Sequence, residues 1–138
     1  MRYLSKHDLM DLHAYVMLRY GGRLGVKSQD KITTALLAPQ QVMFGAEMYH
    51  DLPSKAAALA FSLLKSRPFV SGNEATALIA VLRFLALNGA DLNEETQADD
   101  LAEIIRSVGQ SETSKNGLES WLRQRIRPEQ QEAEPPSS

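Results

Sequence analysis

The sequence predicts an all-α protein with a single domain. Its 138 residues, of which 43% are apolar, suffice for one hydrophobic core but not for two ordinary domains. Apolar residues recur three and four positions apart in six successive segments, which is the spacing that buries one face of a helix. One of these segments, 73–88, is apolar on nearly every side, and such a helix belongs inside a bundle. We therefore expect about six helices around a buried central helix at 73–88.

The first predicted helix has a recognisable start and end. Ser5 stands three residues before Asp8, which is the spacing of a capping box, and Gly21 ends the helix that this box begins. His13 falls on the apolar face of this helix. We expect a core histidine bonded to a backbone group, in preference to the alternative of a catalytic histidine.

The stretch between the first and third helices is more ambiguous. The glycine-rich run 21–27 suits a short hairpin or an open loop. A second helix should start at Ser28 or Asp30 and stop before Pro39, because the residue preceding a proline avoids the helical region. In the segment 39–51 we interpret the large apolar residues as core, in preference to a binding groove: Met43, Phe44, Met48 and Tyr49.

The remaining helices surround the central one. We expect them at 55–65, at 97–108 and at 114–127, where Trp121 should anchor the last helix in the core. The helical domain therefore covers 1–127. Residues 128–138 contain three glutamates and no large apolar residue, so we expect them to form a disordered acidic tail.

Composition excludes several classes of protein. The chain has 15 Lys+Arg against 17 Asp+Glu, and this balance disfavours a nucleic-acid partner. It has no cysteine, which excludes disulfides, thiol nucleophiles and thiolate metal sites. The most apolar stretch, 75–87, is shorter than the roughly 18–20 residues that a membrane span needs. No secretory leader is recognisable, so we expect a cytoplasmic protein without a membrane partner. His7 and His50 lack the spacing of metal ligands, and we predict no metal site from them.

The loop before the central helix is the most informative segment. It reads Arg67-Pro68-Phe69-Val70-Ser71-Gly72-Asn73-Glu74-Ala75-Thr76-Ala77. A glycine followed by a helix start offers unpaired backbone N–H groups to an anion. Phe69 would anchor the loop in the core, and Gly72 would let the backbone approach a ligand closely. Taken alone, a stretch from proline to glycine before a helix is also common in loops that only connect two helices and bind no ligand.

This loop resembles that of the Fic/Doc family, in its short death-on-curing type. The family's loop reads His-Pro-Phe-x-Asp-Gly-Asn-Lys-Arg-Thr-Ala, and a long apolar helix ending in Asn-Gly follows it. Here the corresponding helix ends at Asn88-Gly89. Upstream segments are similar in the same order, and the resemblance covers roughly residues 1–127: Leu12-His13, Arg19-Tyr20-Gly21-Gly22, Gly25-Val26, Ala38-Pro39-Gln40-Gln41 and Lys55-Ala56-Ala57-Ala58.

The resemblance implies a nucleoside triphosphate site at the start of the long helix. In the family, the loop histidine takes a proton from a target hydroxyl, the acidic residue holds Mg²⁺, and the Asn, the backbone and the Lys/Arg pair hold phosphates. ATP and Mg²⁺ are therefore the implied cofactors. The implied nucleotide-binding positions are Phe69, Gly72, Asn73, Ala75 and Thr76.

The resemblance also implies an activity and protein partners. Most members transfer AMP to a protein hydroxyl, whereas death-on-curing members transfer a phosphate and act as toxins that a helical antitoxin segment neutralises. The implied partner here is such a segment or a translation-related target.

Four positions depart from the family pattern. Arg67 stands in place of the histidine and stays protonated, so it cannot act as a base. Ser71 replaces the acidic metal ligand and brings no charge. Glu74 and Ala75 replace the two phosphate-binding cations. The catalytic positions are therefore Arg67, Ser71 and Glu74. Arg67 is either a phosphate clamp or a plain surface arginine, and Glu74 is either a helix-start residue or a catalytic acid.

Three functional hypotheses remain. We favour a protein of this family whose transfer of AMP or phosphate is weakened or lost. The first alternative is an active protein-modifying transferase with altered chemistry, in which Arg67 binds phosphate and Glu74 serves as base. The second sets the resemblance aside and interprets the chain as a six-helix partner-binding domain.

Overall fold

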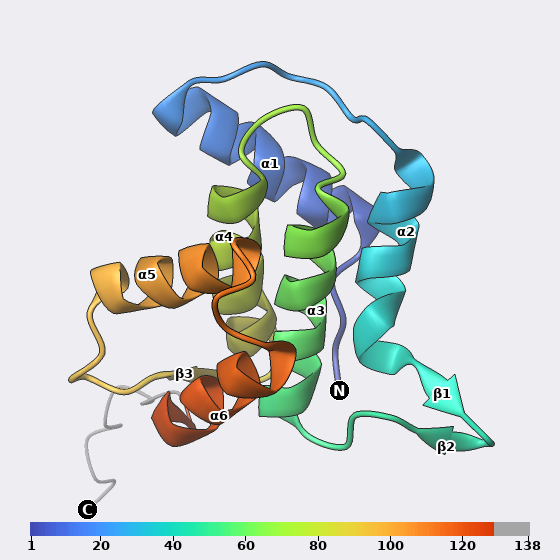
Figure 1. Ribbon diagram of the computed structural model, residues 1–138, viewed down its shortest axis with the longest axis vertical. Helices are drawn as coiled ribbons and strands as arrows, with labels where there is room; N and C mark the ends of the chain where they lie inside the picture. The colour runs from blue at the N-terminus through green and yellow to red at the C-terminus, as the bar shows by residue number, and fades with distance from the viewer. Residues whose placement is uncertain (129–138) are drawn as a thin grey trace, which may run out of the picture.

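The computed structural model describes residues 1–128 and confirms the all-α prediction (Figure 1). Its six α-helices are α1 (Lys6–Tyr20), α2 (Gln29–Leu37), α3 (Leu52–Ser66), α4 (Asn73–Leu87), α5 (Ala98–Gly109) and α6 (Lys115–Arg125). The predicted acidic tail lies outside the described residues, except for Pro128, which belongs to a strand. No helix within the described range is long and apolar enough to span a membrane.

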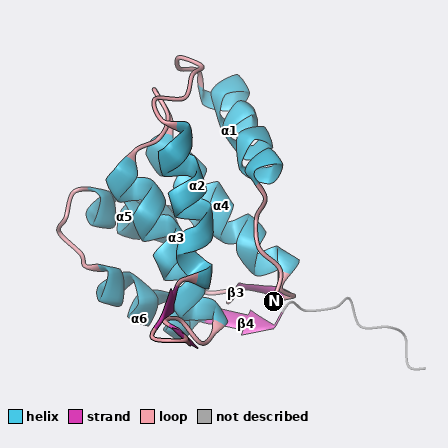
Figure 2. Cartoon of the chain, turned by 90° about the vertical axis from the view of Figure 1, so that its right-hand side faces the viewer, coloured by secondary structure: helices cyan, strands magenta, loops and turns pink. Residues whose placement is uncertain are grey.

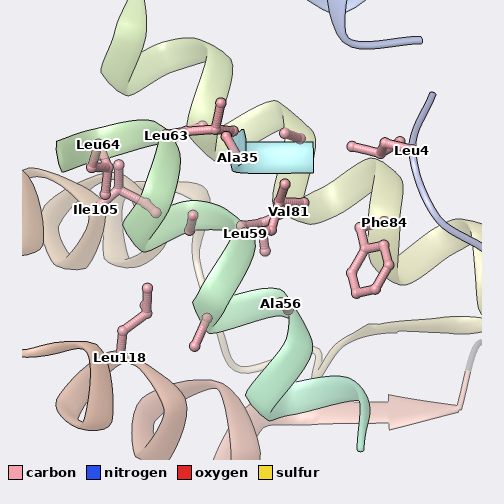
Figure 3. Close-up of a cluster of buried hydrophobic side chains, with 14 of the residues drawn as sticks. Leu4, Ala35, Ala56, Leu59, Leu63, Leu64, Val81, Phe84, Ile105 and Leu118 are labelled. Carbon is pink, nitrogen blue, oxygen red and sulfur yellow. The ribbon is translucent and has the colours of Figure 1, made fainter. Parts of the chain in front are cut away.

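The hydrophobic core forms around α3 and α4 together. α3 packs against α2, α4, α5 and α6, and α4 also packs against α1 (Figure 1). Figure 3 shows this core, in which Leu59 and Leu63 of α3 lie near Val81 of α4. One side of α4 reaches solvent, where Leu82 is 37% exposed. α3 therefore shares the central place that the sequence assigned to 73–88 alone.

Helix ends follow the predicted caps closely. Ser5 and Asp8 form the expected capping box at the start of α1. Asp51 and Ser54 form a second box at the start of α3, where proline occupies the first turn. Such boxes satisfy backbone N–H groups that the helix itself leaves without partners.

Short strands are the main feature that the sequence did not predict. The strands β1 (Val42–Met43) and β2 (Ala46–Glu47) form a hairpin after the 3₁₀ turn η1 (Ala38–Gln40). The strands β3 (Ala90–Leu92) and β4 (Ile126–Pro128) pair antiparallel at the same end of the molecule as α6 (Figure 2). Runs of two or three residues are too short to show a period of two in the sequence.

Two core assignments are wrong. Met43 and Phe44 were expected in the core, but both lie on the exposed hairpin, and Phe44 is fully exposed. Phe44 and Gly45 have φ values of 52° and 79°, and the type I′ turns of two-residue hairpins require positive φ at both positions. Trp121 is only partly buried, because Leu118 and Leu122 supply the fully buried face of α6.

Candidate functional site

The loop of residues 67–72, called the motif loop below, joins the end of α3 to the start of α4. Arg67 turns the chain with a left-handed backbone, at φ 46° and ψ 63°. The Pro68 carbonyl accepts a hydrogen bond from the Lys27 N–H at 2.7 Å, and the Val70 N–H donates to the Gly25 carbonyl at 3.1 Å. The glycine-rich run 21–27 is therefore an open loop that lies against the motif loop and fixes its outer edge.

α1 fixes the middle of the motif loop through His13. The His13 ring is 3% exposed and stacks on Phe69, with 3.8 Å between ring centroids and 7° between ring planes. Its Nε2 lies 3.0 Å from the Ser71 carbonyl oxygen, so this nitrogen carries the proton and donates. The prediction of a core histidine bonded to a backbone group is confirmed.

Asn73 braces the motif loop from inside. Its side-chain oxygen accepts a hydrogen bond from the Phe69 N–H at 3.0 Å, and its side-chain nitrogen donates to the Phe69 carbonyl at 2.9 Å. Both side chains are buried. Both ends of the Asn73 side-chain amide are therefore used by the loop backbone. Asn73 also stands in the first turn of α4.

The start of α4 has no side-chain cap among the residues that the structure describes. Gly72 precedes the helix with φ 77°, and no side chain accepts a hydrogen bond from the first N–H groups. A Cβ at Gly72 would overlap the end of the Met17 side chain, so α1 approaches the backbone here as closely as a glycine allows. Such a helix start presents N–H donors and a positive dipole end.

None of the substituted positions in and after the motif loop, Ser71, Glu74 and Ala75, brings a positive charge to this helix start. Ser71 accepts a hydrogen bond from the Arg23 N–H through its hydroxyl, at 3.2 Å. Glu74 directs its carboxylate over Gly109 of α5, where Oε1 would lie 3.1 Å from a Cβ on that glycine. Arg67 is exposed, which leaves both interpretations of it open.

The structure divides the predicted site residues into two groups. Ser71, Gly72 and Asn73 lie at the junction of the motif loop and α4, and Glu74 and Ala75 follow in the first turn, whereas Arg67 lies at the α3 end of the loop. Phe69 and Thr76 are each 1% exposed and belong to the interior. The Thr76 hydroxyl is buried and has no hydrogen-bond partner within residues 1–128.

The residues present do not fit a magnesium site of the family type. Within residues 1–128, no group of three His, Asp or Glu side chains lies close enough together to hold a metal ion. Mg²⁺ prefers carboxylate oxygens in octahedral geometry. The position where the family has its acidic ligand carries the uncharged Ser71, and Glu74 lies against α5.

A groove of about 960 Å³ begins beside the motif loop. It starts at Lys65 and Ser66, at the end of α3, and extends to η1 and the first hairpin strand. Its lining is mostly apolar. Tyr49, which the sequence analysis assigned to the core in preference to a groove, is among the lining residues, and the others were not connected with a site: Thr34, Leu37, Ala38, Gln40, Gln41, Val42, Ala58, Phe61, Ser62, Lys65, Ser66 and Lys115.

One buried lysine holds the hairpin wall of this groove. The Lys55 side chain is 3% exposed, and its Nζ donates to the Pro39 carbonyl at 3.0 Å and to Glu47 Oε1 at 3.3 Å. Burial by itself lowers the pKa of Lys55, but the interactions with Tyr3 and Glu47 outweigh it and the pKa is raised. Lys55 is therefore charged, and its charge fixes the base of the hairpin.

These features define a helical domain with an open helix start behind a braced loop and beside a groove. The model of the Fic/DOC family matches residues 3–85, which include the motif loop and nearly all of α4, and the chain belongs to this family. The predicted resemblance is confirmed.

Two relatives extend the match beyond that region. The Toxin Doc of Mycolicibacterium smegmatis is 28% identical over 120 residues, which cover 87% of this chain and 90% of that protein. The Protein kinase doc of Escherichia phage P1 is 27% identical over 123 residues, which cover 89% of this chain and 94% of that protein. Both matches are longer than the region that the family model covers, and they take in nearly nine tenths of this chain.

Proposed function

We propose that this chain is a toxin–antitoxin type protein of the Fic/DOC family whose transfer of AMP or phosphate to a protein hydroxyl is weak or lost. The relatives' names supply the toxin class and, for one of them, kinase activity. The proposal that activity has declined rests on one observation. The motif loop keeps its internal bracing through His13, Phe69 and Asn73, while no base or charged metal ligand stands at Arg67 or Ser71.

Magnitudes support this conclusion. A general base contributes about 10²–10⁴ in rate. A cation at the transferring phosphate contributes about 10³–10⁵ in phosphoryl transfer, where charge stabilisation carries most of the catalysis. Glu74 and Ala75 replace both family cations, and the two effects act at one site without simply multiplying. What the fold keeps is a surface for a protein partner, such as an antitoxin segment or a former target, in the cytoplasm.

The second candidate function is an active transferase with altered chemistry. The uncapped start of α4 favours it, because free N–H groups there can still bind a phosphate. In that case Arg67 would act as the phosphate cation and Glu74 as the base. The present position of Glu74 over Gly109 counts against a role as base without a change of rotamer.

Isothermal titration of ATP with Mg²⁺ tests the proposal. The protein is compared with a restored variant that carries Arg67→His, Ser71→Asp, Glu74→Lys and Ala75→Arg, and circular dichroism checks that both are folded. We expect binding and transfer of labelled phosphate or AMP only in the restored variant. Efficient transfer by the unmodified chain would refute the proposal in favour of the second candidate.

A further inference from the structure

The end of the molecule that carries the motif loop has an uneven distribution of charge. Two segments lie side by side there, 12–29 and 66–73, and backbone hydrogen bonds join them, such as that from the Lys27 N–H to the Pro68 carbonyl at 2.7 Å (Figure 1). Together the two segments contain four Arg or Lys residues and no Asp or Glu. These four residues form what we call the basic surface: Arg19, Arg23, Lys27 and Arg67.

The cations of the basic surface are not neutralised by the protein itself. All four side chains are exposed, and none of the ion pairs within residues 1–128 includes one of them. The near balance of charge over the whole chain, which disfavours a nucleic-acid partner in general, therefore conceals a positive region. The Lys and Arg residues that do pair with carboxylates lie elsewhere: Lys55, Arg106, Arg123 and Arg127.

Exposed tyrosines lie among these cations. Tyr20 stands between Arg19 and Arg23 and is 69% exposed, and Tyr15, more than one turn earlier on α1, is 51% exposed. The face of an aromatic ring is electronegative, so it disfavours the carboxylates of an acidic protein. An unpaired nucleic-acid base, by contrast, stacks on such a ring while its phosphates meet the neighbouring cations.

We propose that the basic surface binds a single-stranded nucleic acid, with phosphates at the four cations and a base stacked on Tyr20. The bases of a duplex are stacked on one another and are not available to a tyrosine ring. The chemistry recognised is a flexible phosphate backbone with free bases, which RNA and DNA strands share. The inference does not rest on the proposed function, because three of the four cations and Tyr20 lie outside the motif loop.

Fluorescence anisotropy with labelled oligonucleotides and the full chain tests the inference. The probes are single strands of oligo(U) and oligo(dT), a duplex of equal length and a polyglutamate peptide. We expect both single strands to bind, and to bind more tightly than the duplex or the peptide. Because three or four phosphates are neutralised, affinity should fall roughly 20- to 50-fold between about 50 and 200 mM salt.

Two sets of variants separate the contribution of charge from that of stacking. Replacing Arg19, Arg23 and Lys27 together by Gln should weaken binding at least about tenfold and remove most of its salt dependence. Tyr20→Ala should weaken binding about fivefold or more through lost stacking, whereas Tyr20→Phe keeps the ring and should keep the affinity.

A matched control removes the same charge elsewhere. Arg2→Gln/Lys6→Gln/Arg83→Gln changes three exposed cations, of which Lys6 begins α1 and Arg83 lies near Asp8. This variant should bind both single strands as the unmodified chain does. Circular dichroism and thermal melts check that all variants are folded.

Several results would overturn the inference. These are an absence of binding to either single strand at low salt, equal or tighter binding of the duplex or the peptide, a Gln triple variant of the basic surface that binds normally, and equal affinities of Tyr20→Ala and Tyr20→Phe. None of these variants changes a residue of the motif loop. A failure of the proposed function therefore appears in nucleotide transfer, whereas a failure of this inference appears in oligonucleotide affinity.

Discussion

The first backbone N–H groups of a helix have no partners within the helix, and α3 and α4 differ in how these groups are treated. At the start of α3, Asp51 accepts hydrogen bonds from the Ser54 N–H and hydroxyl, and Arg123 of α6 holds the carboxylate at 2.6 Å. At the start of α4, Gly72 provides no side chain, and the first N–H groups remain open. The start of α3 is therefore capped by side chains of this protein, whereas the start of α4 has no side-chain cap among the described residues.

The difference extends to the residues behind each helix start. The Asp51 cap ties α3 to α6, so it contributes to the fold. At α4, His13 and Asn73 brace the loop from its buried side, through the Ser71 carbonyl and the Phe69 backbone. The left-handed backbone of Gly72 and its contact with Met17 leave no room for a capping side chain at position 72. The uncapped start of α4 therefore goes together with the close approach of α1 to Gly72.

The largest effect should come from removing the internal brace. Asn73→Ala leaves the N–H and carbonyl of Phe69 without partners inside the protein. Two unsatisfied buried groups cost about 2–4 kcal/mol in free energy of unfolding, which urea denaturation measures. Asn88→Ala serves as control, because that amide lies at a more exposed helix end. An equal loss in the two variants would contradict the bracing role.

A somewhat smaller effect should follow from adding a side chain at Gly72. Gly72→Ala combines a left-handed backbone with an overlap against Met17, for an expected cost of about 1–3 kcal/mol. Gly89→Ala is the matched control, because Gly89 has φ 69° and nothing within 4 Å of its Cβ position. The difference between the two unfolding free energies isolates the contact with α1. If both variants lose the same stability, the backbone alone is responsible.

The sequence predicted the frame of this site better than its surroundings. Glycine, proline and the capping residues mark helix ends locally, so the motif loop and α4 could be placed within a residue. His13 could be assigned to the core because it falls on an apolar helix face. The carboxylate of Glu74, by contrast, takes its position from Gly109, which lies 35 positions away in the chain but adjacent in space.

The groove could not be predicted for a similar reason. Its lining comes from α2, η1, the hairpin, α3 and Lys115 of α6, and no local pattern joins these segments. Met43 and Phe44 were mistaken for core residues because their apolar character does not reveal which face of a short hairpin they occupy. The uncapped start of α4 could be foreseen from Gly72. The two hydrogen bonds between the Asn73 side chain and the Phe69 backbone could be recognised only in the folded loop.

The closed start of α3 should be sensitive to acid. Arg123, and then Ser54, hold the pKa of the Asp51 carboxyl well below its usual value. Because the folded pKa is below the unfolded one, this carboxylate stabilises the fold above about pH 4, and the contribution disappears as pH falls below that value. Asp51→Asn keeps a side-chain oxygen for the cap but loses the charge that pairs with Arg123, so it should lose about 0.5–1 kcal/mol at pH 7.

Urea denaturation at a series of pH values measures this effect. The stability difference between the unmodified chain and Asp51→Asn should begin to shrink below about pH 4 and should still be falling at pH 2, because the folded pKa of Asp51 lies well below the unfolded one. Asp99→Asn in the first turn of α5 is the control, because Asp99 takes no part in the capping box there. A difference that stays constant from pH 7 to pH 2 would show that the charge of Asp51 is irrelevant.

The smallest effect should come from Gly109→Ala, and it sharpens the interpretation of Glu74. Gly109 ends α5 with an ordinary helical backbone, so alanine there should add up to about 1 kcal/mol of stability. The new Cβ would lie 3.1 Å from Glu74 Oε1, which is the far end of a flexible side chain and can move aside. The displaced carboxylate would then lie closer to the open start of α4.

A gain in stability from Gly109→Ala that is unchanged when Glu74→Ala is added would show that the Glu74 side chain moves freely. A net loss in Gly109→Ala that Glu74→Ala rescues would show that α5 holds this carboxylate in place.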